Sequence, residues 1–116
     1  MDRDARAYLW DVQQACEAIG RFTVGLDEAS YAQDALITAA VERKFEIIGE
    51  ALNQLAKLSP DLAQRVPHLR EIIGFRNVLV HGYAAVDQRR VWRIIETSLP
   101  NLHATVSLLL AELGPA

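Results

Sequence analysis

The chain has 116 residues, of which 51% are hydrophobic and only 7% aromatic, and its formal net charge is −3. This size favours one domain over residues 1–116, and the abundance of alanine and leucine favours helices over a sandwich of strands. No stretch approaches the ~20 uncharged apolar residues that cross a bilayer, and the N-terminus lacks the apolar block of a signal peptide, so we expect a cytoplasmic protein with no membrane partner.

The first predicted helix covers residues 3–23. Apolar side chains recur there at intervals of three and four residues, which places them on one face of a helix. The central positions of this stripe are Leu9, Val12, Cys16 and Ile19. Cys16 is the only cysteine, so it cannot form an internal disulfide, and its place in the stripe indicates a small core residue rather than a reactive thiol.

A second predicted helix follows a turn over residues 23–28. Ser30, with Gln33 three residues later, fits a capping box that restarts a helix. From residue 30 or 38 to Leu58 the apolar side chains cover more than one face, so we expect this helix to be buried on two sides. They include Leu36, Ile37, Val41, Ile48, Leu52 and Leu55. Pro60 should stop the helix, because proline cannot continue the hydrogen-bond ladder.

Two further helices complete the prediction. One should begin near Pro67 and end at Gly82, since glycine suits a helix terminus. The other, capped by Asp87, should run to Leu113 along an apolar seam and be kinked by Pro100. Four helices with short connections describe an all-α, up-and-down bundle. The seam is long for so small a core, and surplus apolar surface of this kind predicts a homodimer.

Charge is unevenly distributed along the chain. Residues 1–64 hold six Lys or Arg against eleven Asp or Glu, whereas residues 65–93 hold six Arg against two acidic residues, a local charge of +4. The six are Arg65, Arg70, Arg76, Arg89, Arg90 and Arg93. The overall charge argues against indiscriminate nucleic-acid binding, but this basic window can contact a polyanion. A solvated basic face is the simpler alternative.

Arg76 and His81 have the chemistry that cleavage of RNA requires. A guanidinium is permanently charged and matches phosphate oxygens, while a histidine passes a proton in either direction near neutral pH. RNA supplies its own nucleophile, the 2′-hydroxyl, so the histidine can remove that proton or protonate the leaving 5′-oxygen while the arginine stabilises the phosphorane. No metal or cofactor is needed. On spacing alone, however, a helix-terminal histidine stabilised by the helix dipole is the commoner case.

The spacing of these two residues creates a geometric difficulty. Five residues at ~100° each put Arg76 and His81 about 140° apart on a regular helix, whereas Asn77 and His81 share a face. Two solutions exist: the helix ends at His81 so that its ring turns back, or a second subunit supplies a complementary pair across a dimer axis. His68 and His103 form no metal-ligand spacing with the other candidates, so we interpret both as surface or capping residues and expect no metal.

A longer run around this pair resembles a known family. The end of the predicted third helix reads Arg70-Glu71-Ile72-Ile73-Gly74-Phe75-Arg76-Asn77-Val78-Leu79-Val80-His81-Gly82-Tyr83, followed by Val86-Asp87 and Trp92. This run resembles the signature of the HepT-like group within the HEPN ribonuclease superfamily. Three other segments extend the likeness over nearly the whole chain: Gly25-Leu26-Asp27, Glu46-Ile47-Ile48-Gly49-Glu50-Ala51 and Leu99-Pro100-Asn101-Leu102.

The resemblance implies a fold, an activity and a set of roles. HEPN ribonucleases carry an arginine, a polar residue, three variable residues and a histidine, here Arg76, Asn77 and His81. It implies a helical-bundle dimer in which two such motifs meet in a cleft, and metal-independent endonucleolytic cleavage of RNA, with no DNA substrate expected. His81 would be the acid–base group, Arg76 would bind the scissile phosphate, and Asn77 would orient one of them.

The same resemblance implies a partner. In this group a toxin is paired with a minimal nucleotidyltransferase, MntA-like, which silences it by transferring AMP to the tyrosine of the Arg-x4-His-x-Tyr pattern, here Tyr83. An adenylate two residues from His81 would add bulk and negative charge beside the cleft. Without the resemblance, Tyr83 would be interpreted as an amphipathic residue at a helix end. Glu46 and Glu50 match the family block, but pairing with Arg43, Lys44 or a buried arginine explains them equally well.

We therefore expect an endoribonuclease toxin of a toxin–antitoxin pair, whose RNA track is extended by Arg70, Arg89, Arg90 and Arg93. Two alternatives remain open. One is a noncatalytic helical dimer that binds a nucleotidyltransferase partner. The other is a nucleotide-binding protein that uses the same arginine and histidine as phosphate ligands without cleavage.

Overall fold

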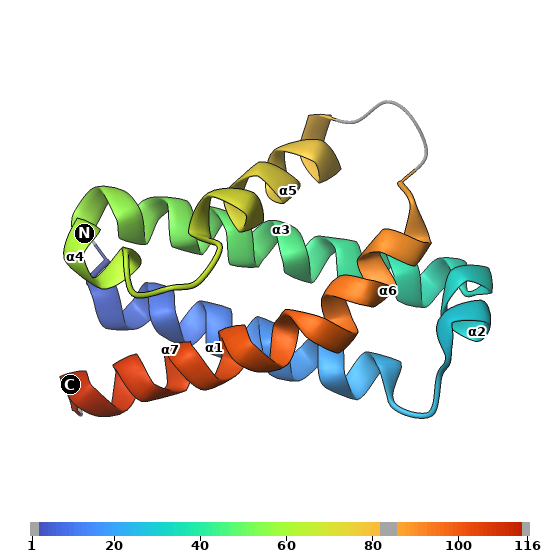
Figure 1. The fold of residues 1–116 in the computed structure, drawn as a ribbon, viewed down its shortest axis with the longest axis horizontal. Helices are drawn as coiled ribbons and strands as arrows, with labels where there is room; N and C mark the ends of the chain where they lie inside the picture. The colour runs from blue at the N-terminus through green and yellow to red at the C-terminus, as the bar shows by residue number, and fades with distance from the viewer. Residues whose placement is uncertain (1–2, 82–85, 115–116) are drawn as a thin grey trace.

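Seven helices and no strand are found in residues 3–81 and 86–114, the part of the chain that the computed structural model describes (Figure 1). They are α1 (Ala5–Thr23), α2 (Glu28–Gln33), α3 (Ala35–Leu58), α4 (Pro60–Ala63), α5 (Leu69–His81), α6 (Gln88–Thr97) and α7 (Leu99–Leu113). The all-α prediction is confirmed. The long helices alternate in direction, α1 and α5 one way, α3 and the α6–α7 pair the other (Figure 1).

Aspartate side chains start most of these helices. Asp4, Asp34 and Asp87 each accept a hydrogen bond from a backbone N–H of the following turn. The predicted capping box at Ser30 was wrong by one turn, because the N-cap of α2 is Asp27 and Ser30 occupies its N3 position. The Ser30 N–H donates to the Asp27 carboxylate at 2.8 Å, which lowers the pKa of that carboxyl. The helix dipole stabilises a negatively charged carboxylate at the N-terminus more than it stabilises a neutral serine hydroxyl, so aspartate is the stronger N-cap here.

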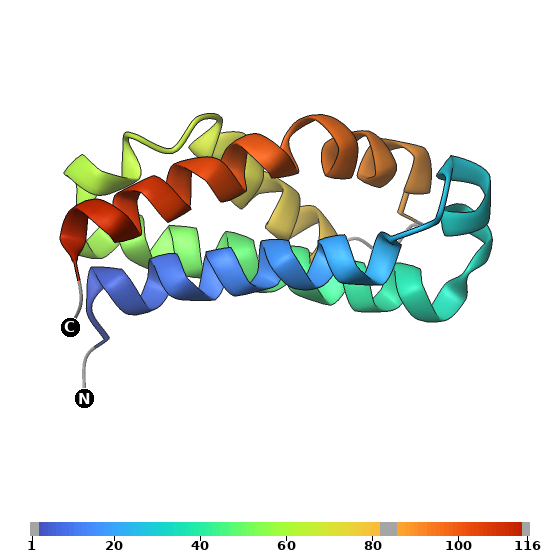
Figure 2. The ribbon, with the colours of Figure 1, turned by 90° about the horizontal axis from the view of Figure 1, so that it is seen from below.

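The predicted last helix is two helices. α6 ends at Thr97 and α7 begins at Leu99. The predicted helix is therefore interrupted at Ser98 and is not kinked at Pro100. Pro100 lies in the first turn of α7, where a missing N–H costs nothing because the first four N–H groups of a helix have no intrahelical acceptor. Figure 2 shows α6 and α7 following one another along one side of the molecule, with a change of direction between them.

The core forms around α3, which contacts α1, α4 and α5, as the prediction of burial on two sides requires. Its fully buried side chains include Leu52 and Leu55. Cys16 of α1 belongs to this core, and burial raises the pKa of its thiol to about 12, which confirms its interpretation as a core residue. Leu36, which was counted among the apolar positions, is 81% exposed because it lies in the first turn of α3 outside the packed faces.

The apolar seam of the last predicted helix packs against other helices of the same chain. α7 packs against α1, and the seam residues Val91, Ile95, Leu99, Leu102, Val106 and Leu109 are all buried. Only its end, Leu113, is 38% exposed. The surplus apolar surface from which a homodimer was predicted is therefore mostly internal. In the described residues, no helix is long and apolar enough to cross a membrane.

Two leucines on α3 test this account of the core. Leu52→Ala should lower the free energy of unfolding by about 2–5 kcal/mol, because it empties a fully buried position. Leu36→Ala, the same change on the same helix, should alter it by less than about 0.5 kcal/mol. Urea denaturation followed by circular dichroism measures both, and equal effects would contradict the assignment of the core.

Candidate active site

Helix α5 carries Arg76, Asn77 and His81 and lies against α3. Its main anchor is Phe75, which is buried and meets Phe45 of α3 edge to face, with 5.5 Å between the ring centroids. The helix ends at His81. Tyr83 and the predicted terminus Gly82 lie outside the described residues, so the position of Tyr83 relative to the other site residues stays a prediction.

Gly49 allows α3 and α5 to approach each other closely beside Arg76. A Cβ built on Gly49 would overlap the Cβ of Arg76 and lie 2.8 Å from its Cγ. The aliphatic stem of Arg76 therefore rests directly on the backbone of α3. A glycine inside a long helix lowers helix stability, and here the close approach explains its presence.

The guanidinium of Arg76 is held from two sides. Its Nη2 lies 3.0 Å from Glu50 Oε2, and its Nη1 donates a 2.8 Å hydrogen bond to Asn77 Oδ1. Gln54 Nε2 in turn donates to the other oxygen of Glu50 at 3.0 Å. The Arg76 side chain remains 27% exposed, so its remaining N–H groups can reach a ligand. The structure thus brings Arg76 and Asn77 together, and it adds Glu50 and Gln54 to them.

Glu50 is the residue whose partner the sequence left open. Of the alternatives considered, it pairs with a half-buried arginine, Arg76, while Glu46 pairs with Arg43 at 3.2 Å. The signal available in the sequence was the glycine beside Glu50. A glycine in the middle of a long helix marks a place where another backbone or stem approaches, but it does not say which one.

His81 stands apart from this cluster. It is exposed at the last residue of α5, and in the described residues no hydrogen bond or ion pair joins it to Arg76 or Asn77. Arg76 turns toward α3, whereas His81 is the last residue of α5 and is exposed. The angular separation predicted from the sequence is therefore retained within one chain.

The remaining arginines of the basic window are on the surface. Arg65 forms a bidentate ion pair with Glu112: its Nη1 donates to Oε1 at 2.8 Å and its Nη2 donates to Oε2 at 2.7 Å. The arginines predicted to extend an RNA track are all exposed, and none forms an ion pair within the described residues; they are Arg70, Arg89, Arg90 and Arg93. Three of them lie on α6, so the basic charge gathers there.

The other histidines have separate environments. His103 lies on α7 and contacts Glu17 at 2.9 Å. His68 precedes α5 with a backbone φ of 58°, a left-handed conformation that histidine adopts more readily than most residues. In residues 3–81 and 86–114, no three His, Cys, Asp or Glu side chains are grouped so that they could hold a metal ion.

The chain is similar to known proteins over most of its length. A family model described as "Ribonuclease HepT-like" matches residues 12–109. A protein of Methanocaldococcus jannaschii named as a candidate RNase is 29% identical over 109 residues, covering 92% of this chain and 97% of the relative. A candidate RNase of Caldanaerobacter subterraneus is 34% identical over 107 residues, covering 92% and 95%.

A third relative carries the family's own name. A candidate ribonuclease HepT of Thermococcus cleftensis is 33% identical over 102 residues, which cover 88% of this chain and 92% of the relative. No solved structure matches the chain.

Two glycine substitutions of opposite expected sign test the close approach at Gly49. Gly49→Ala should lower the free energy of unfolding by about 1–3 kcal/mol, because the new methyl group overlaps the Arg76 stem. Gly20→Ala, in open space on α1, should raise it by about 0.5–1 kcal/mol through helix propensity. Urea denaturation gives both values, and stabilisation by both substitutions would show that α5 does not touch α3 at this point.

Proposed function

The chain belongs to the HepT-like ribonuclease family, and we propose from this that it is an endoribonuclease, the toxin of a toxin–antitoxin pair, that cleaves RNA with Arg76 and His81. The observation that carries the proposal is the fixed, partly exposed guanidinium of Arg76 on the helix that ends at His81. Its orientation is set by Glu50 and Asn77 before any ligand binds, and such preorganisation is what electrostatic catalysis requires.

Each residue has a role that follows from its environment. Arg76 binds the scissile phosphate and stabilises the charge that develops on its oxygens. Asn77 and Glu50 are positioning residues, because they touch the guanidinium and limit its rotation. Exposed at the helix end, His81 takes the proton of the 2′-hydroxyl or gives one to the leaving group. The 2′-oxygen then bonds to phosphorus and the bond to the 5′-oxygen breaks, leaving a 2′,3′-cyclic phosphate and a 5′-hydroxyl.

This chemistry requires no metal, and the active site is proposed to be composite. Since Arg76 and His81 point about 140° apart on α5, a second copy of the chain supplies the missing neighbour. Val78 and Val80 lie between them on α5 and are 47% and 44% exposed. Exposed β-branched side chains around a polar site are suited to burial against a second copy. Analytical ultracentrifugation tests this arrangement: a homodimer at micromolar concentration is expected, and a monomer that cleaves RNA would contradict it.

Regulation by a partner belongs to the same proposal. An MntA-like nucleotidyltransferase transfers AMP to Tyr83, which lies two positions after His81 and outside the described residues. The added phosphate carries negative charge next to the site that binds the RNA backbone, so it competes with the substrate electrostatically and sterically.

Cleavage assays on purified protein test the catalytic pair. His81→Ala and Arg76→Ala should each lower kcat for a structured RNA by about 100-fold or more, through loss of proton transfer and of phosphate stabilisation. Arg65→Ala, which removes an exposed arginine paired with Glu112, should leave kcat within about 2-fold. EDTA should have no effect on the wild type.

Circular dichroism spectra of all variants provide the folding control. RNA cleavage by His81→Ala at the wild-type rate would rule out the proposed chemistry. Binding of a nucleotidyltransferase by a wild type that cleaves no RNA would favour the noncatalytic dimer.

Mass spectrometry tests the regulatory site. Protein coexpressed with an MntA-like nucleotidyltransferase should gain the mass of one or more AMP groups on Tyr83 and lose cleavage activity. Tyr83→Phe should stay unmodified and stay active in its presence. Full silencing of Tyr83→Phe by the partner would show that inhibition does not use this hydroxyl.

A further inference from the structure

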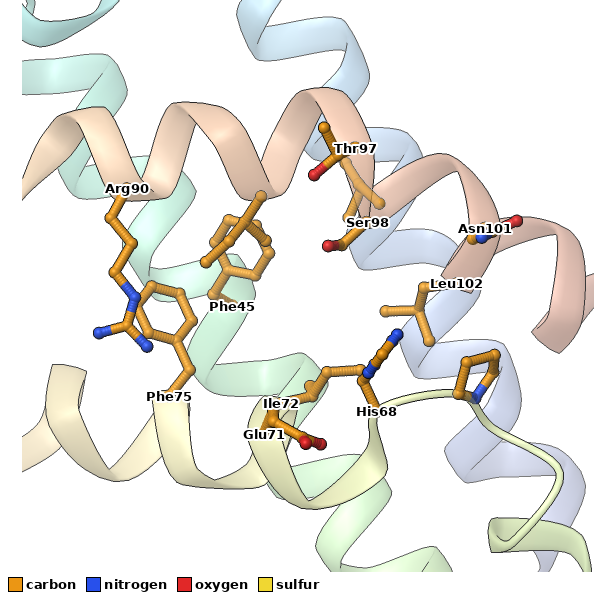
Figure 3. Close-up of a pocket in the computed structure, with 13 residues that line it drawn as sticks. Phe45, His68, Glu71, Ile72, Phe75, Arg90, Thr97, Ser98, Asn101 and Leu102 are labelled. Atoms are coloured by element: carbon orange, nitrogen blue, oxygen red, sulfur yellow. The ribbon is translucent and has the colours of Figure 1, made fainter.

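A cavity of about 480 Å³ lies between the start of α5 and the junction of α6 and α7, with α3 behind it (Figure 3). Its size is in the range of sites that bind small organic groups. None of Arg76, Asn77 and His81 lines it. It is therefore separate from the candidate active site, although both use α5.

One wall of the cavity is aromatic and cationic. Phe75 is buried with its ring against Phe45, and the guanidinium of Arg90 lies over the Phe75 ring, 5.5 Å from its centroid. Figure 3 shows the guanidinium of Arg90 lying against the Phe75 ring, with the Phe45 ring beside them. Because both rings are buried and Arg90 covers Phe75, the surface that this wall offers to a ligand is the guanidinium plane, on which a flat π system can stack.

The other walls are polar at the rim. Ser98 and Asn101 come from the α6–α7 junction and Glu71 from α5 (Figure 3). In the described part of the chain, no hydrogen bond or ion pair occupies these three side chains, so they can serve a ligand. An amide, a hydroxyl and a carboxylate together match the ring nitrogens, carbonyls and exocyclic amines of a nucleobase.

The surroundings point to RNA as the source of the base. Phe75 precedes Arg76 directly, so the cavity and the phosphate-binding guanidinium lie on neighbouring sides of α5, about 100° apart. Arg89 and Arg93 continue the positive charge along α6 beyond Arg90, and both are exposed. A strand whose backbone follows these arginines can place one base in the cavity.

We propose that this cavity binds the base of one unpaired nucleotide of the RNA substrate, stacked on the guanidinium of Arg90 and held at its edge by Glu71, Ser98 and Asn101. The proposal rests on the proposed function, because that function supplies the RNA. It assigns Arg90 a role different from that of Arg89 and Arg93, which contact only the backbone.

Binding of abasic RNA tests the proposal. A single-stranded RNA with 2′-O-methyl groups, which blocks the nucleophile, is titrated with the wild-type protein and followed by fluorescence anisotropy. Each nucleotide is replaced in turn by an abasic unit. One position should raise Kd by about 5- to 100-fold, the range expected for loss of one stacked base. The absence of any such position overturns the proposal.

Arg90→Ala and its matched control locate that base. In Arg90→Ala, the rise in Kd caused by the abasic unit at the sensitive position (the abasic penalty) should fall to less than about 3-fold, because the base has lost its stacking partner. Arg93→Ala, also an exposed arginine of α6 but outside the cavity, should weaken binding of all the RNAs equally and keep the penalty. Asn101→Ala, at the exposed rim, should reduce the penalty without changing the dependence on salt. An unchanged penalty in Arg90→Ala overturns the proposal.

Two further readouts separate the possible failures. Conversion of the protein from dimer to monomer by Arg90→Ala and Asn101→Ala, seen in sedimentation, would mean that a second copy fills the cavity and would overturn the proposal. Failure of the proposed function is seen separately, as RNA cleavage that survives Arg76→Ala and His81→Ala. Because the abasic titration measures binding alone, its result does not depend on that assay.

Discussion

The contact between the backbone of α3 at Gly49 and the stem of Arg76 on α5 sets the geometry of the functional half of the molecule. Without a side chain at Gly49, α5 can lie directly on α3, and Phe75 then reaches Phe45 in the core. The same closeness brings the guanidinium of Arg76 within 3.0 Å of Glu50, the next residue along α3. The absence of a side chain at Gly49 therefore determines the position of α5, of its aromatic anchor Phe75 and of the Arg76 guanidinium together.

The ion pair at this contact acts on geometry more than on stability. Glu50 is 45% exposed, and an ion pair so accessible to water contributes at most about 1 kcal/mol to folding. Its effect is to remove freedom from a long side chain. With Asn77 on one nitrogen and Glu50 on the other, the guanidinium would need little reorganisation to bind the phosphate of the proposed substrate. Because the ion pair between Arg76 and Glu50 is only partly buried, the guanidinium could bind the phosphate of the proposed substrate while it stays paired with Glu50 and while α5 stays packed on α3.

Helix α5 presents different chemistry on each of its sides. Arg76 faces α3, Phe75 forms a wall of the cavity beneath α6, Val78 and Val80 are exposed, and His81 lies at the end. Since a helix turns by about 100° per residue, consecutive residues must diverge in this way. One short helix can consequently carry the proposed phosphate site, the proposed base site and the proposed contact with a second copy. It cannot by itself bring its arginine to its histidine.

The sequence by itself determined the long helical segments and the core, because apolar spacing at three and four residues is a local property; Leu9, Leu52 and Cys16 are buried as predicted. It did not predict the short helices α2 and α4 as separate elements. The helix boundaries depended on competition between neighbouring signals, as the break at Ser98 shows. Only the tertiary structure decided that Glu50 pairs with Arg76, and that Arg90 covers Phe75 beside a cavity. Those contacts join residues 15 to 26 positions apart, and sequence spacing carries no information on how two helices are placed side by side.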